Sequence, residues 1–168
     1  MTYAPAISPT WLTLTASRLM PRLFSQAESS GLREGTGSRA ATPPVSTRQP
    51  ARWLISALER LDFLASLGPG WDEVAAQPIS LDLITAAANF LASDPVSELK
   101  VQPDIVPTFE GGLLIEWHTE AVDFIIESSP SAGPSFYFLD HETGEEVEAP
   151  LGEHLEAVAT AFTKLASR

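Results

Sequence analysis

Three segments of the chain place hydrophobic residues at intervals of three and four, which is typical of amphipathic helices. They predict helices over residues 51–67, over residues 81–93 and from residue 151 towards the C-terminus. Gly68-Pro69-Gly70 suits the end of the first helix, and Ser80 followed by Asp82 suits the start of the second. The expected apolar faces are Leu54, Leu58, Leu61, Leu64 and Ala65 in the first helix, Leu81, Ile84, Ala88 and Leu91 in the second, and Leu151, Leu155, Val158, Phe162 and Leu165 in the third.

Between the second and third helices the hydrophobic period changes to two, which predicts half-buried β-strands. Two such runs, residues 113–118 and 122–127, flank Thr119-Glu120, where we expect a two-residue turn. The expected pairs are Trp117 with Val122, Ile115 with Phe124, and Leu113 with Ile126. A slip of one residue would send these side chains to opposite faces, so the pattern favours this register. It places Glu116 opposite Asp123.

Further strands are expected on both sides of this pair. Upstream, a Glu110-Gly111-Gly112 turn would set Phe109 opposite Leu113 and Ile105 near Trp117, and two prolines put that strand at an edge of the sheet. Downstream, strands are expected over residues 135–139 and 145–148. The predicted fold is α+β: two N-terminal helices, an antiparallel meander of four to five strands, and a C-terminal helix packed on the sheet.

The first 52 residues differ in composition from the rest. They contain 23 Ser, Thr, Pro or Gly residues, and the stretch from about residue 25 to residue 52 has almost no large apolar side chains. Such a stretch cannot bury enough surface to offset its ordering entropy. We therefore expect residues 1–52 to form a disordered arm, with a weak helix over Trp11–Phe24, and residues 53–168 to form one domain. The arm could also be a targeting segment or reflect a start placed too far upstream.

Charge follows the same division. Residues 1–52 carry six arginines against Glu28 and Glu34, a net charge of +4, whereas residues 53–168 carry four basic and twenty acidic residues, a net of −16; the sum is −12. A domain of this charge repels phosphates, so we expect no direct nucleic acid binding by the folded domain. No apolar run approaches the length of a membrane span, and the absence of cysteine fits a reducing, cytoplasmic compartment.

Several motifs together resemble a widespread, uncharacterised family of small bacterial and phage proteins. The motifs are Gly70-Trp71-Asp72, the Pro78-Ile79-Ser80 sequence before a helix ending in Phe90-Leu91, and a hairpin of the form Pro-Thr-x-x-Gly-Gly-x-x-x-Glu-Trp over residues 107–117. The resemblance covers about residues 53–148 and implies no activity. It also implies a small residue after Trp71-Asp72, where this chain has Glu73.

Acidic residues on the predicted strands are the main candidates for chemistry. Glu116 and Asp123, with His118 and Glu127 on the same strand face, could share a proton or bind a hard cation. The structural alternative is a solvated acidic face or a partner-binding surface, because charge networks without catalytic function also gather acids.

Other motifs give weaker indications. Trp71-Asp72 could be a helix cap whose indole fills the core, or a recognition hot spot. The three histidines, His118, His141 and His154, have no metal-ligand spacing, and the Gly35–Ala40 glycine pattern lacks the strand and helix of a dinucleotide site. The sequence therefore predicts no cofactor, no metal site and no catalytic residue.

These observations favour a non-enzymatic interaction module that binds a basic protein partner through an acidic surface. Antitoxin-like, immunity-like and phage-defence accessory roles all fit its size and charge. The alternative is a carboxylate-dependent enzyme or divalent-metal-binding protein centred on the strand-face acids. The residues expected to contact a partner are Trp71, Asp72, Glu116, His118, Asp123 and Glu127.

Overall fold

The computed structural model describes residues 51–94 and 96–167 of the 168-residue chain. Its elements are helices α2 (Arg52–Ala65) and α3 (Leu81–Leu91), the short 3₁₀-helix η1 (Val96–Glu98), strands β1 (Asp104–Pro107), β2 (Leu113–His118), β3 (Val122–Ser128), β4 (Ser135–Asp140) and β5 (Glu146–Pro150), and helix α4 (Leu155–Ala166). The strands form one antiparallel sheet in the order β1-β2-β3-β4-β5. The expected α+β fold, with a meander followed by a helix, is confirmed. The helix expected over Trp11–Phe24 and the arm up to residue 50 lie outside the described residues.

Helices α2 and α3 lie where the hydrophobic spacing predicts them, but their buried faces differ from the expected ones. Leu58 of α2 is 39% exposed. In α3, Leu81 is 65% exposed, and the buried residues are Leu83, Ala86, Ala87, Phe90 and Leu91. The expected α3 stripe is right for Leu91 and in part for Ile84 and Ala88, which are partly buried against the core, but wrong for Leu81. The segment contains apolar residues on most sides, so spacing alone did not identify the side that meets the sheet. Ser80 occupies the N-cap position without a side-chain capping hydrogen bond.

Both expected hairpin registers were wrong by two residues. In the β2–β3 hairpin Trp117 pairs with Phe124 and Ile115 with Ile126, so Glu116 lies opposite Ile125 rather than Asp123. The reason is the position of the turn, which lies one residue later than expected and is closed by a hydrogen bond from the Thr119 N–H to the Val122 carbonyl. The Thr119 hydroxyl also accepts hydrogen bonds from the backbone N–H groups of residues 121 and 122. Because a shift of two residues keeps every side chain on its original face, the predicted inward and outward residues are retained.

The β1–β2 hairpin shows the same kind of shift. Ile105 pairs with Ile115, and the turn is closed by a hydrogen bond from the Thr108 N–H to the Gly112 carbonyl, so Phe109 belongs to the turn. Gly111 has a φ of 82°, and a Cβ there would lie 2.6 Å from the Pro78 carbonyl oxygen. The turn therefore needs glycine at this position for both backbone conformation and space.

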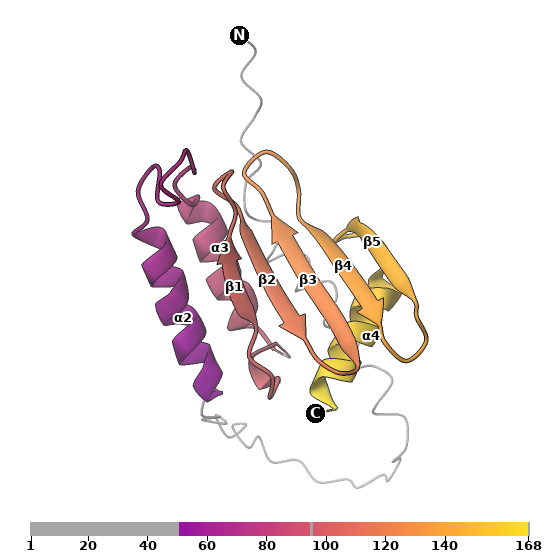
Figure 1. Ribbon diagram of the computed structural model, residues 1–168. Coiled ribbons are helices and arrows are strands. Elements are labelled where there is room, and N and C mark those ends of the chain that lie inside the picture. The colour runs from indigo at the N-terminus through magenta and orange to yellow at the C-terminus, as the bar shows by residue number, and fades with distance from the viewer. Residues whose placement is uncertain (1–50, 95, 168) are drawn as a thin grey trace, which may run out of the picture.

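One face of the sheet is covered by helices, and the other is not. Figure 1 shows α3 and α4 behind the sheet, with α2 beside α3 at the β1 edge. The covered face carries the core, in which Trp117, Phe124 and Phe162 have ring centroids 5.4–6.3 Å apart. No described element lies over the opposite face of the sheet, which we call the open face (Figure 1).

The outer edge of β1 lies next to α2. Arg60 of α2 donates a hydrogen bond from Nε to the Ile105 carbonyl oxygen at 3.1 Å, and its guanidinium lies over the Phe63 ring. This contact satisfies one of the backbone groups that an edge strand leaves unpaired. None of the described helices is long and apolar enough to cross a membrane.

Candidate functional site

The open face combines a central apolar strip with surrounding carboxylates. Alternation along the strands sends the apolar strip and the acids to the same side of the sheet. The apolar strip consists of the partly exposed residues Leu114, Ile125, Tyr137 and Leu139. The surrounding carboxylates are Asp104, Glu116, Asp123, Glu127, Glu146 and Glu148.

Cross-strand pairing places the acids close to the apolar strip and to one another. Ile125 and Tyr137 are directly opposite at the centre, and Glu148 is opposite Tyr137 on the next strand. Asp104 is opposite Glu116. Like charges directly opposite in a sheet are unfavourable unless a cation lies between or over them.

No permanent positive charge balances these acids within the sheet. The chain contains no lysine or arginine between residues 101 and 163, a stretch that includes all five strands. Binding a positively charged surface would therefore relieve repulsion within this face, and the same field would repel phosphates.

Two histidines meet at one carboxylate near the β2–β3 turn. His118 Nδ1 lies 2.9 Å from Asp123 Oδ1, and His141 Nε2 lies 3.2 Å from Asp123 Oδ2. On its other side the His118 ring approaches Glu116, with 3.6 Å between Nε2 and Oε2. The imidazole of His118 thus lies between the carboxylates of Glu116 and Asp123, which the expected register had paired directly across the strands.

This contact alters the protonation of both partners. The hydrogen bond to Asp123 is the main reason why the pKa of His118 is raised, although partial burial opposes the shift. Partial burial would raise the pKa of Asp123, but hydrogen bonds from His118 and His141 outweigh it and lower that pKa. The cluster therefore favours charged His118 against charged Asp123, which is an ion pair rather than a carboxylate pair sharing a proton.

Glu116 and Asp123 do not form the directly opposed pair on which the metal and acid–base alternative was centred. Glu116 and Asp123 are not cross-strand neighbours, and His118 lies between their carboxylates. Among residues 51–94 and 96–167, no group of three or more histidine, aspartate or glutamate side chains is arranged to hold a metal ion.

Trp71 and Asp72 lie apart from the open-face acids, in the loop between α2 and α3. The loop is joined to the tip of the β1–β2 hairpin by a hydrogen bond from the Gln77 N–H to the Phe109 carbonyl. This tip adjoins the start of β2, at Leu113, whereas His118 is at the other end of the strand. The structure therefore brings Glu116, His118, Asp123 and Glu127 onto one face and separates the Trp71-Asp72 pair from them.

Asp72 organises its loop rather than capping a helix, so the helix-cap interpretation was wrong. Its Oδ1 accepts hydrogen bonds from the backbone N–H groups of Val74, Ala75 and Ala76 at 2.9–3.1 Å. These bonds, that from Ala76 most strongly, lower the pKa of Asp72. The Trp71 indole is partly exposed and donates to the Gln77 carbonyl at 3.1 Å, so it does not fill the core.

We expect Glu73→Gly to stabilise the protein, because Glu73 has a φ of 66°, a conformation that glycine adopts without steric cost. The expected gain in the free energy of unfolding is about 0.5–1 kcal/mol, measured by urea denaturation. Glu73→Gln is the matched control, because it removes the charge but keeps the side chain on a left-handed backbone. An equal gain in both variants would show that charge rather than conformation is responsible.

Sequence reasoning missed several open-face residues. Tyr137, Leu139, Glu146 and Glu148 follow the same strand alternation and were detectable by extending the period-two analysis to the last two strands. His141 follows β4 in a turn, and no local pattern indicates that it meets Asp123.

Comparison with protein-family models, with curated proteins and with solved structures finds no match.

Proposed function

We propose that the protein is a non-enzymatic interaction module whose open face binds a basic protein partner. The observation that carries the proposal is the composition of this face: six carboxylates around an apolar strip, without a lysine or arginine in any of the five strands. An apolar centre with a polar rim is the usual organisation of a protein interface. The complementary partner presents arginine or lysine side chains around a small apolar centre.

The separate loop that contains Trp71 and Asp72 has at most a secondary role in binding the partner. It lies beyond the end of β2 that is opposite to the histidine cluster, and it contributes no residue to the apolar strip or to the surrounding carboxylates. We assign the partner contact to the sheet face and regard Asp72 as a structural residue. Antitoxin-like, immunity-like and phage-defence accessory proteins remain the roles that such a module would serve.

The test is titration of the isotopically labelled full chain with a synthetic peptide of alternating arginine and leucine, followed by NMR. We expect shift changes centred on Ile125, Tyr137 and Leu139 that weaken with added salt. Replacing three acids of the face (Glu116→Gln, Glu127→Gln and Glu148→Gln) is expected to weaken binding about tenfold, since each exposed pair contributes a fraction of a kcal/mol.

The control variant changes the same number of charges on the helical layer. Its substitutions are Glu59→Gln, Asp62→Asn and Glu156→Gln, all at exposed positions. We expect this variant to bind the peptide nearly as well as the parent. Equal weakening in the two variants would show that only net charge matters, and shift changes confined to the helices would contradict the proposed site.

A further inference from the structure

The open face has a candidate occupant within the same chain. Residues 11–24 read Trp-Leu-Thr-Leu-Thr-Ala-Ser-Arg-Leu-Met-Pro-Arg-Leu-Phe, which combines two arginines and seven large apolar residues with no acid. We propose that residues 11–24 bind the open face of their own domain and compete there with the basic partner. This inference rests on the proposed function, because it assigns the same face.

The chemistry of the segment matches the face in both of its parts. Arg18 and Arg22 would lie among the carboxylates, and guanidinium groups suit this role because they pair with carboxylates in two-pronged geometry and are weakly hydrated. They can also stack on an aromatic ring, which Tyr137 provides at the centre of the face. The leucines and Trp11 of the segment correspond to the strip of Leu114, Ile125 and Leu139.

The other basic part of the N-terminal sequence matches less well. Residues 33–48 contain Arg33, Arg39 and Arg48 but also Glu34, and between them stand mainly small and polar residues. They could supply charge but little apolar area, and apolar burial is the main favourable term in association. We therefore assign the face to residues 11–24.

The length of the chain allows this contact. Residues 25–50 separate the segment from Ala51, just before α2. A chain of that length can span up to roughly 90 Å, several times the radius of a domain of this size, which is about 13 Å for 100 residues. Covalent attachment makes the contact intramolecular, so a modest affinity is enough for substantial occupancy.

The consequence is a regulated module. A basic partner must displace residues 11–24, so its apparent affinity is reduced by the fraction of molecules in which the face is occupied. Removing the two arginines should release the face without altering any residue of the described domain. This separates the inference from the proposed function, which requires only that the face binds basic ligands.

The first test locates the segment by spin labelling. The chain contains no cysteine, so Ser17→Cys gives one attachment site for a nitroxide in the full-length protein. We expect paramagnetic broadening of the methyl signals of Ile125 and Leu139, and little at Thr160 and Thr163, which are exposed on α4 behind the sheet. The broadening should disappear at high salt. Absent broadening, or equal broadening on both sides of the molecule, would overturn the proposal.

A mixed sample separates binding within one chain from binding between two. Isotopically labelled protein without nitroxide is combined with unlabelled protein that carries it, and we expect no broadening. Broadening of Ile125 in this sample would show that a second copy supplies the segment and would overturn the intramolecular arrangement.

The second test measures competition in the full chain. Arg18→Gln with Arg22→Gln is expected to increase affinity for the arginine–leucine peptide at least threefold, whereas Arg33→Gln with Arg39→Gln, the same change of charge, should leave it within a factor of about two. Equal increases would show a general charge effect, and no increase would show an unoccupied face; either result overturns the inference. If the peptide binds neither the parent nor any variant, the proposed function itself is wrong.

Discussion

Gly112→Ala is expected to destabilise the protein by about 3 kcal/mol, because a methyl group at this position has no space. A Cβ on Gly112 would lie 2.3 Å from the Ser128 carbonyl oxygen and 2.9 Å from Thr108 Oγ1. Ser128 is the backbone partner of Leu113 in the β2–β3 ladder, so relief of the clash requires the strands to move apart. The change also disturbs the two hydrogen bonds between residues 108 and 112, both 3.0 Å long.

The loss is measured by urea denaturation, in which the midpoint falls while the slope stays constant. Gly133→Ala is the matched control, since a Cβ there meets nothing within 4 Å and the residue has no positive φ. We expect the control to change the free energy of unfolding by less than about 0.5 kcal/mol. A Gly112→Ala variant as stable as the control would mean that the hairpin accommodates the methyl group by a movement absent from this structure.

Local periodicity predicted the elements of this fold but not the pairing between them. The positions of the three helices and of β2 and β3 follow from apolar spacing, and those of the other strands from turn residues beside them, all of which depend on neighbours within a few residues. In each turn a threonine hydroxyl, that of Thr108 or of Thr119, accepts hydrogen bonds from backbone N–H groups and so helps to set the register. Moving a turn by one position shifts every cross-strand pair by two residues without changing the hydrophobic pattern, so the pattern could not distinguish the alternatives.

The composition of the open face was easier to predict than the register of the hairpins, because a shift of two residues keeps each side chain on its face. An even shift leaves Glu116, His118, Asp123 and Glu127 on one face, so the acidic face expected from the sequence is present although the expected Glu116–Asp123 pair is not. The convergence of His141 on Asp123 depends on the path of a turn between two other strands. Sequence spacing therefore predicts the composition of the face, and only the structure shows which of its side chains touch.

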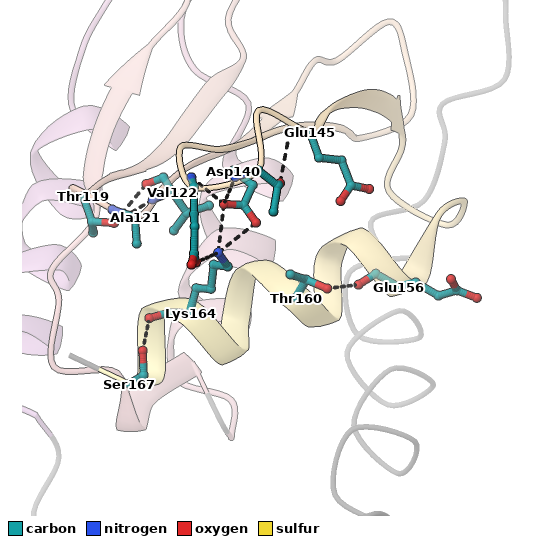
Figure 2. Close-up of polar contacts among 11 residues, drawn as sticks. Thr119, Ala121, Val122, Asp140, Glu145, Glu156, Thr160, Lys164 and Ser167 are labelled. Atoms are coloured by element: carbon teal, nitrogen blue, oxygen red, sulfur yellow. Dashed lines mark hydrogen bonds and ion pairs between the residues drawn. The ribbon is translucent and has the colours of Figure 1, made fainter.

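Helix α4 is attached to the sheet by an ion pair whose loss should lower the thermal midpoint by roughly 5–10 °C. Lys164 Nζ lies 2.8 Å from both carboxylate oxygens of Asp140, at the end of β4, and 3.3 Å from Glu142 Oε2 (Figure 2). Asp140 is only 3% exposed. Lys164→Met keeps much of the side-chain length but leaves this buried carboxylate without its cation, which costs more than replacing both partners.

The pH dependence identifies the ion pair as the cause. The hydrogen bond from Lys164, supported by the N–H groups of Glu142 and Thr143 and opposed by burial, lowers the pKa of Asp140 from 3.8 to about 2. A carboxyl with a lowered pKa stabilises the folded state above its unfolded pKa, and this contribution is lost as pH falls from about 4 to about 2. We therefore expect the melting temperatures of the parent and Lys164→Met to differ most near neutral pH and to converge across this acid range.

Lys100→Met is the control, since Lys100 is exposed and its loss changes net charge equally. If the two lysine variants melt at the same temperature, Lys164 contributes only charge and α4 is held by its apolar face. Lys164→Met combined with Asp140→Asn should recover part of the loss, because the amide keeps an acceptor for both N–H groups while removing the unpaired charge.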